Sequence, residues 1–232
     1  MEANIESNIR YVQDRMAASA AAAGRAYEDV SLLAISKTFP VDAISQAVAA
    51  GLNKFGENRV QEAENKIPRF RENTELEWHL VGHLQSNKSR LAAELFDVIH
   101  SIDSIRLAEK LNEACLNIGK KLSLFLQVDL GKEKTKFGID PDRLPEIIEA
   151  VSRFERLRLD GLMTLPPYYE DPEKTRPYFV RLRNLRDALE TSRPGCLGRQ
   201  QLSMGMSHDF EVAIQEGSTI VRIGTSIFGL RQ

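Results

Sequence analysis

The feature of this chain that most limits its fold is a repeating order, in which eight short apolar runs alternate with segments of helical spacing. The runs are nearly continuous in hydrophobicity, as expected of strands that are buried on both faces of a parallel sheet. The segments between them carry apolar residues at the interval of a helix face. The expected strands cover residues 31–38, 53–58, 77–84, 97–103, 123–130, 157–165, 200–207 and 218–226.

The expected helices have recognisable ends. Pro40 and Asp42 open the first helix after a strand, and Gly51 closes it. An alanine-rich helix over residues 4–23 precedes the first strand. Further helices are expected from about residue 59, and over residues 104–119, 144–151, 179–189 and 208–216.

This order predicts one α/β domain over residues 1–232, with no Gly/Ser-rich linker and no break in composition. The expected fold is a single (β/α)8 TIM barrel with an extra N-terminal helix that covers part of the barrel wall, and 232 residues suit such a barrel. A doubly wound open sheet is the alternative architecture. The GxGxxG pattern that often accompanies that sheet does not follow the first strand, which favours the barrel.

Composition excludes several classes of protein. The formal net charge is -2, from 31 basic and 33 acidic residues, and binders of nucleic acid or membrane surfaces normally have a strong basic excess. The N-terminus lacks an apolar signal core, and residues 17–23 are far short of the roughly 20 needed to span a bilayer. Cys115 and Cys196 form neither a metal-binding spacing nor a disulfide framework. A cytoplasmic protein with reduced thiols and no metal is expected.

The first functional candidate is Lys37, which terminates the first apolar run. In a β/α barrel, functional groups gather where the strands end and the loops begin. Partial removal from water there favours the neutral, nucleophilic form of the amine, which imine formation with an aldehyde requires. The alternative is a lysine whose stem is covered while its charge extends to solvent.

The ends of the last two strands predict a phosphate cup. Loops after strands seven and eight often bind phosphate in such barrels. Gly205 and Gly224 allow the backbone to approach an anion closely, and Arg222 adds a positive charge among apolar neighbours. Hydroxyl groups in these loops come from Ser203, Ser207, Thr225 and Ser226. The alternative is a pair of tight turns with an internal ion pair.

Other polar residues lie at the ends of strands two, three and five. Asn58 is a candidate for a hydrogen bond to a ligand or for capping the next helix. His79 is expected to be a core histidine with one hydrogen bond, whereas His83, nearer the mouth, is the better ligand candidate. Residues 86–88 read as a helix start. Loop 131–139 contains Lys132, Lys134 and Lys136, which are expected to be solvated, with a gating or cofactor-binding role as the alternative.

A lysine on strand one lies beside a phosphate cup at strands seven and eight, because a closed barrel places strand eight next to strand one. Phosphate plus amine describes a phosphorylated aldehyde bound as an imine. The same pair also suits a sugar-phosphate aldolase that uses the lysine without a cofactor. The residues alone leave both readings open.

Six segments in order along the chain closely resemble the pyridoxal phosphate homeostasis protein family (YggS/PROSC type). They are LLAISKTFP (32–40), FGENRVQE (55–62), EWHLVGHLQSNK (77–88), GLMTL (161–165), LSMGMSHDFEVAI (202–214) and GSTIVRIGTSIFG (217–229). The resemblance implies a barrel similar to the N-terminal domain of alanine racemase, with pyridoxal 5'-phosphate (PLP) held as an internal aldimine.

Carried over residue by residue, the resemblance implies a role for seven positions. Lys37 resembles the Schiff-base lysine. Arg222 resembles the arginine on the side of the pyridine nitrogen. Asn58 and Met204 look like neighbours of the ring. The residues that resemble the phosphate cup are Ser203, Gly224 and Thr225.

The family also implies a function: control of intracellular PLP (vitamin B6) without established catalysis. The resemblance suggests PLP-dependent apo-enzymes as recipients and a monomeric protein. The alternative is a PLP-dependent amino-acid racemase or lyase. Alanine racemases complete their site with a second domain that supplies a tyrosine acid/base. A barrel without that second acid/base is expected to be poor at proton transfer on both faces of the cofactor.

Overall fold

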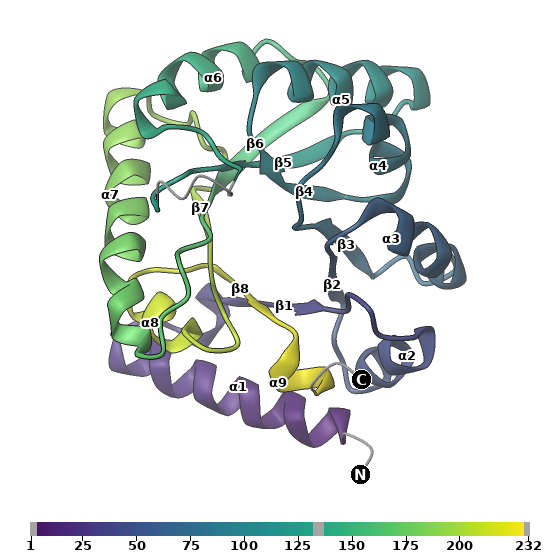
Figure 1. Cartoon of the computed structure of the whole chain (residues 1–232), viewed down its shortest axis with the longest axis vertical. Helices are drawn as coiled ribbons and strands as arrows, with labels where there is room; N and C mark the ends of the chain where they lie inside the picture. The colour runs from purple at the N-terminus through teal and green to yellow at the C-terminus, as the bar shows by residue number, and fades with distance from the viewer. Residues whose placement is uncertain (1–3, 132–136, 230–232) are drawn as a thin grey trace.

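The computed structural model describes residues 4–131 and 137–229. Its parallel strands close into one barrel in sequence order, and β1 pairs with both β2 and β8. The predicted (β/α)8 barrel is therefore confirmed (Figure 1). The strands are β1 (Ser31–Ile35), β2 (Lys54–Glu57), β3 (Glu77–Leu80), β4 (Val98–Ile102), β5 (Leu122–Gln127), β6 (Leu157–Met163), β7 (Gln201–Met206) and β8 (Ile220–Ile223).

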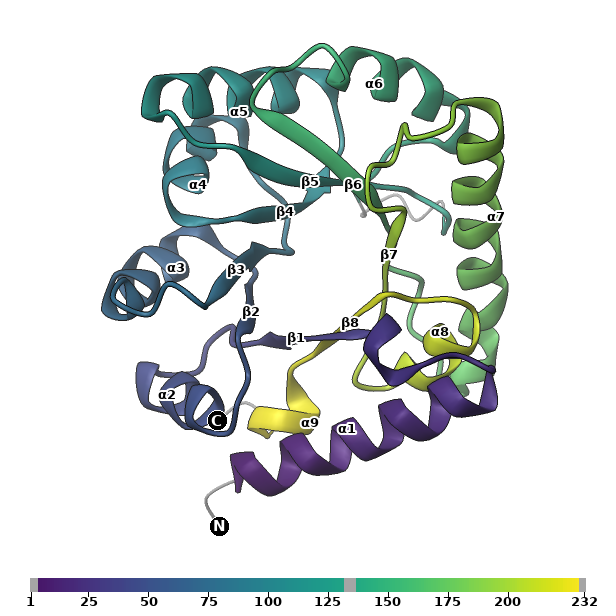
Figure 2. The ribbon, with the colours of Figure 1, turned by 180° about the vertical axis from the view of Figure 1, so that it is seen from behind.

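Helices surround the strands on the outside, as the two opposite views show (Figures 1 and 2). Short 3-10 segments occupy residues 27–29, 67–70, 86–88, 141–143 and 172–175. The α-helices are α1 (Ile5–Ala22), α2 (Val41–Ala49), α3 (Val60–Lys66), α4 (Ser89–Leu95), α5 (Ile105–Ile118), α6 (Leu144–Val151), α7 (Arg176–Ser192), α8 (Phe210–Gln215) and α9 (Thr225–Phe228).

The N-terminal helix covers the barrel wall where β8 meets β1. The Asn4 side chain caps α1 by accepting a hydrogen bond from the Ser7 amide at 3.0 Å. One face of the helix buries Ile9, Val12 and Met16 against α2, α8 and α9. The expected extra helix is thus present, and its apolar face completes the outer layer at the junction of the two ends of the sheet.

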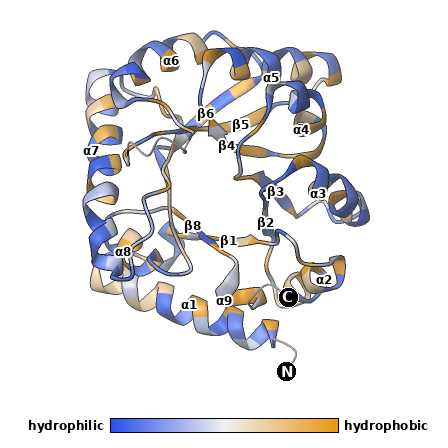
Figure 3. Ribbon diagram, viewed as in Figure 1, coloured by the Kyte–Doolittle hydropathy of each residue, from blue (hydrophilic) through white to orange (hydrophobic). Residues whose placement is uncertain are grey.

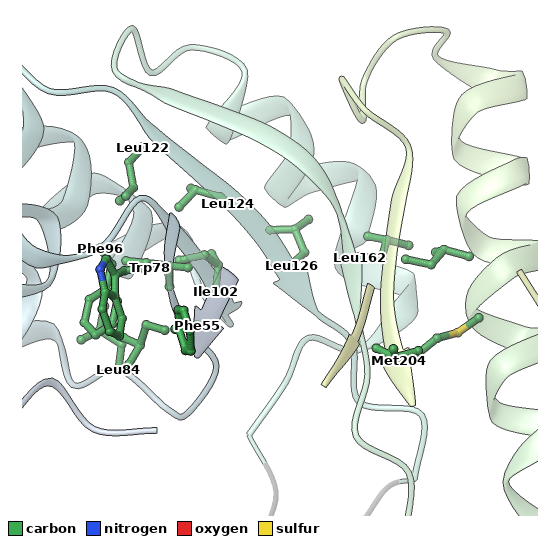
Figure 4. Close-up of a cluster of buried hydrophobic side chains, with 14 of the residues drawn as sticks. Phe55, Trp78, Leu84, Phe96, Ile102, Leu122, Leu124, Leu126, Leu162 and Met204 are labelled. Atoms are coloured by element: carbon green, nitrogen blue, oxygen red, sulfur yellow. The ribbon is translucent and has the colours of Figure 1, made fainter. Parts of the chain in front are cut away.

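Two apolar layers hold the barrel together. The outer layer lies between strands and helices, and Figure 4 shows part of it around Phe55, Trp78 and Leu124. The strands carry many apolar residues, and hydrophilic residues are frequent on the surrounding helices (Figure 3). A smaller inner layer includes Phe125 and Met163, and full burial of each such side chain stabilises the fold by roughly 1.5–3 kcal/mol.

The observed strands are shorter than predicted, and the difference lies mainly at their C-terminal ends, although β8 also begins two residues later than predicted. Residues 36–38 and 81–84, for example, are turn or loop rather than strand. The predicted runs continue past the last strand residue because apolar loop residues such as Val81 face the mouth of the barrel. No helix in the described ranges is both long and apolar enough to cross a membrane.

Candidate functional site

A cavity of about 400 Å³ lies at the C-terminal ends of the strands, where functional groups of β/α barrels gather. Its volume is within the range of pockets that hold small ligands. Residues that follow β1, β2, β3, β6, β7 and β8 contribute to its wall. The lining consists of Ile35, Lys37, Phe39, Asn58, Val81, Gly82, Leu165, Met206, Ser207, His208, Arg222, Gly224, Thr225 and Gly229.

Lys37 lies in a tight turn that follows β1. The Phe39 amide donates to the Ser36 carbonyl at 3.1 Å, so Lys37 and Thr38 are the two central residues of a β-turn. The Lys37 side chain is partly exposed and lines the cavity. The Phe39 ring stacks on Phe228 of α9, with 5.1 Å between ring centroids. This contact ties the lysine turn to the end of β8.

The adjoining wall is a polar loop pair that follows β7 and β8. The Ser207 hydroxyl accepts long hydrogen bonds from the amides of Gly224 at 3.3 Å and Ser226 at 3.5 Å. Gly224 packs so closely on β1 that a Cβ there would lie 3.2 Å from the Ile35 carbonyl oxygen. Gly205 has a φ of +92, a backbone conformation that residues with a side chain rarely adopt. These backbone N–H groups and hydroxyls are the donors that an anion needs.

Arg222 lies beneath this loop pair with only 4% of its surface exposed. Its guanidinium donates to the Ser203 carbonyl and hydroxyl, each at 2.7 Å, and to the Thr164 carbonyl at 2.9 Å. Burial lowers its pKa to about 10, and the nearby Asp209 carboxylate acts in the opposite direction. Arg222 therefore keeps its charge at neutral pH and is fixed in orientation.

A chain of buried hydrogen bonds continues from Arg222 through the barrel interior. The Ser203 hydroxyl is 2.8 Å from Nδ1 of His100, and His100 Nε2 is 2.8 Å from Nδ1 of His79. His79 Nε2 is 2.7 Å from Oε1 of Glu77 at the start of β3. Burial lowers the pKa of both histidines, whereas the hydrogen bond from His79 lowers the pKa of Glu77 to about 2.

Neutral histidines give this chain one consistent direction. Arg222 donates to Ser203, whose hydroxyl donates to His100; His100 Nε2 then donates to His79, and His79 Nε2 donates to the carboxylate of Glu77. A positive charge stands at one end and a negative charge at the other, with neutral groups between them. The arrangement satisfies each polar group without a buried imidazolium, which desolvation would disfavour.

The structure brings five of the seven predicted site residues to the cavity: Lys37, Asn58, Arg222, Gly224 and Thr225. Ser203 and Met204 do not line it, and both side chains are fully buried. Successive residues of a strand face opposite sides. Ser203 faces inward onto Arg222 and His100, whereas Met204 packs in the outer layer toward the helices (Figure 4).

Other residues differ from the sequence prediction in their partners. His79 has two hydrogen-bonded partners instead of the expected one. His83 lies outside the cavity lining; it faces Asp103 at 3.4 Å and stacks on Phe137. His100 had no signal in the sequence, because its role depends on the register between β3 and β4. The three lysines of loop 131–139 lie outside the described residues.

A metal site has no support in the described part of the chain. Among those residues, no group of three or more histidine, cysteine, aspartate or glutamate side chains is arranged to hold an ion. The donors at the cavity are instead an amine, a guanidinium, hydroxyls and backbone N–H groups.

Comparison with known proteins gives close relatives over the whole chain. The model of the alanine racemase N-terminal domain matches residues 2–232. The pyridoxal phosphate homeostasis protein of Escherichia coli K12 is 44% identical over 234 residues, covering 98% of this chain and 97% of that protein. The protein of the same name from Aquifex aeolicus is 42% identical over 221 residues, covering 95% of this chain and 96% of the relative.

A solved structure supports the same grouping. PipY of Synechococcus elongatus PCC7942, in a structure with PLP bound, is 39% identical with a TM-score of 0.82, and the match covers 94% of this chain and 100% of that one. Identity of this size over nearly the full length shows the family as well as the fold. The chain belongs to the alanine racemase N-terminal domain family, among its pyridoxal phosphate homeostasis proteins.

Proposed function

We propose that this protein binds pyridoxal 5'-phosphate in the cavity at the barrel mouth, through a covalent link to Lys37, and takes part in intracellular PLP homeostasis. The observation that carries the proposal is the meeting, in one cavity, of a lysine, a buried arginine and a loop rich in N–H and hydroxyl donors. The relatives named as homeostasis proteins, and the PLP in the PipY structure, support this choice of ligand.

The residues present fit this cofactor. A primary amine suits its aldehyde, and the backbone N–H groups near Gly224 and Ser226, with the hydroxyls of Ser207 and Thr225, suit its phosphate. Arg222 suits the pyridine side. Gly82 lets the loop after β3 pack directly on the backbone of Asn58, because a Cβ there would lie 2.1 Å from the Asn58 carbonyl oxygen. When bound, the cofactor would supply an aldehyde for the amine of Lys37, and a C=N link between them would form with release of one water.

Arg222 would weaken the electron withdrawal that a bound cofactor supplies. An arginine is a donor only, so a ring nitrogen that faces Arg222 must accept a hydrogen bond and stay unprotonated. An unprotonated ring withdraws electrons less strongly. The fixed contacts of Arg222 to Ser203 and Thr164 hold this donor in place.

The cavity lining also favours a holding role. Among the described lining residues there is no tyrosine, aspartate or glutamate, and Lys37 and His208 are the lining side chains there with an amine or imidazole that could accept a proton. His208 Nε2 lies 3.0 Å from each of two backbone carbonyls, those of Tyr169 and Glu170. We therefore propose a non-catalytic carrier. We further propose that it acts as a cytoplasmic monomer and delivers PLP to apo-enzymes.

Absorption spectroscopy of protein mixed with PLP tests the proposal. The wild type is expected to develop the yellow absorbance of a protein-bound imine, and Lys37→Ala is expected to lose it. Lys121→Ala is the matched control, because Lys121 is an exposed lysine that precedes β5 at the other end of the barrel. Equal absorbance in Lys37→Ala and wild type would refute the assignment.

A second assay separates carrier from enzyme. The loaded protein is incubated with a panel of L- and D-amino acids, and the enantiomer ratio and keto-acid formation are measured. No turnover above the Lys37→Ala background is expected. Lysine-dependent racemisation of any amino acid would instead identify a PLP-dependent enzyme.

A further inference from the structure

Two side chains of helix α3 form hydrogen bonds to the turn that carries Lys37, one on each side of this lysine. We call this pair of contacts the grip. The Lys66 ammonium of α3 donates to the Ser36 carbonyl at 2.8 Å, on the N-terminal side of Lys37. The Glu62 carboxylate of α3 accepts from the Thr38 amide at 3.0 Å, on the C-terminal side. Glu62 and Lys66 are four residues apart and therefore lie on the same face of the helix.

The backbone of Thr38 is strained, and the two contacts from α3 hold it in that conformation. Its φ of 65 lies in the left-handed region, which β-branched residues strongly disfavour. It occupies the third position of the turn from Ser36 to Phe39, where a type II turn needs a positive φ and glycine is normal. A strained residue of this kind persists only where its surroundings hold it, and it often marks a functional site.

Lys66 and Glu62 differ in how deeply they are buried and in how many other contacts hold them in place. Lys66 also donates to Oε1 of Glu57 at 2.9 Å, and the Ser36 hydroxyl donates to the same oxygen at 2.7 Å. Glu57 is fully buried and the Lys66 side chain is only 11% exposed. Glu62 is 27% exposed, with the mostly exposed Arg59 at 4.0 Å as a second contact. Lys66 is thus a fixed anchor, and Glu62 is the side of the grip that can open.

We propose that Glu62 and Lys66 are positioning residues for Lys37, and that the Glu62 contact holds the strained turn in the form that directs the lysine into the cavity. The inference rests on the proposed function, because it assumes that Lys37 is the attachment point of the cofactor. Only the fraction of molecules with the turn formed is ready to link Lys37, so loss of the grip lowers the attachment rate in proportion.

A rescue experiment separates positioning from general stability. The rate of imine absorbance on mixing with PLP is measured for wild type, Glu62→Ala, Thr38→Gly and the double variant. Glu62→Ala is expected to be slower by up to about fivefold, the factor by which loss of one hydrogen bond lowers the equilibrium constant for turn formation. Thr38→Gly is expected to remove the need for the grip, because glycine adopts a positive φ without strain. The double variant is therefore expected within about twofold of Thr38→Gly.

Glu64→Ala is the matched control, since Glu64 is an exposed glutamate on the same helix. It is expected to attach PLP at the wild-type rate. Hydrogen exchange of the Thr38 amide, followed by NMR in cofactor-free protein, gives a second reading. This exchange is expected to be faster in Glu62→Ala and unchanged in Glu64→Ala, because only Glu62 accepts from that amide.

Two outcomes would overturn the positioning role. One is an attachment rate in Glu62→Ala equal to that of Glu64→Ala. The other is a slow double variant, which would mean that Glu62 acts on something other than the strained turn. Failure of the proposed function looks different: wild type would then form no imine, while the Thr38 exchange would still depend on Glu62.

Discussion

Lys37 and Arg222 come from neighbouring strands, yet they are held in opposite ways. The lysine lies in a partly exposed turn with a strained residue, gripped by two side chains of α3. The arginine is buried within β8, and its guanidinium bonds to Ser203 and Thr164. The difference matches their proposed tasks. A lysine that forms and breaks a covalent link must move, whereas a group that faces an aromatic nitrogen must stay fixed.

The energetic consequences differ as well. Removing part of a buried, fully bonded network leaves unsatisfied polar groups and a cavity, which costs several kcal/mol. Changing an exposed residue of the turn costs little, because water replaces lost hydrogen bonds; the buried anchor Lys66 is the exception on this side. We therefore expect the stability of the fold to depend mainly on the Arg222 side of the cavity and the kinetics of attachment to depend on the Lys37 side.

The largest effect on stability is expected from Arg222→Ala. It removes the guanidinium donor from the Ser203 and Thr164 carbonyls and empties a large buried volume, so we expect a loss of about 3–5 kcal/mol. Urea unfolding of the cofactor-free protein measures this. Arg10→Ala is the control, since its pair with Glu6 is exposed and worth less than about 1 kcal/mol. Similar losses in the two variants would contradict the contrast between the two regions.

The second largest loss of stability is expected when Lys66, the anchor of the lysine turn, is replaced. Lys66→Met leaves the buried Glu57 without its cation, and one Glu57 oxygen has no hydrogen-bond partner in the described structure even with Lys66 present. We expect a loss of about 2–3 kcal/mol in urea unfolding. Burial already raises the pKa of Glu57, so the double variant Glu57→Gln/Lys66→Met is expected to recover part of this loss. No recovery would show that Glu57 is not the source of the cost.

The pH dependence of stability tests the buried chain below Arg222. Because folding lowers the pKa of His79 and His100, the unfolded state binds more protons below the ordinary histidine pKa near 6.5. The contribution of these two histidines to the free energy of unfolding is therefore complete above that pH and is lost as the pH falls through it. For His100 the expected loss is about 1 kcal/mol between pH 6.5 and 5.5. In His100→Gln, unfolding midpoints should fall less over this interval; an equal fall would exclude His100 as its cause.

The smallest expected effect is that of Thr38→Gly. Glycine relieves the left-handed strain but adds entropy to the unfolded chain, so we expect a change in unfolding free energy of less than about 1 kcal/mol. Thermal unfolding checks it, with Thr191→Gly in helix α7 as a contrast that should be destabilising. A large loss in Thr38→Gly would mean that the threonine side chain itself is needed.

Much of the fold could be predicted from the sequence, because eight hydrophobic runs alternate with helix signals in the order of a barrel. The ends of the strands were harder to predict, because loop residues such as Val81, which follows β3, are as apolar as the strand residues before them. For the site, the motif resemblance indicated Lys37, Arg222 and Gly224, and the structure brings all three to one cavity.

Other features of the site depend on strand register, side-chain direction and backbone conformation, which the pattern of residues along the sequence does not reveal. Ser203 and Met204 are adjacent in one strand, so they face opposite sides and cannot both reach a cofactor. The chain from His79 to His100 needs the register of β3 against β4. The left-handed Thr38 gives no warning in the sequence, because glycine is the residue expected there.

The most direct test of the central claim is to map the point of attachment. The protein is loaded with PLP, reduced with borohydride to make the link permanent, digested, and analysed by mass spectrometry. The account predicts a phosphopyridoxyl group on the peptide that contains Lys37, and its loss in Lys37→Ala. A group found only on another lysine, or on none, would contradict it.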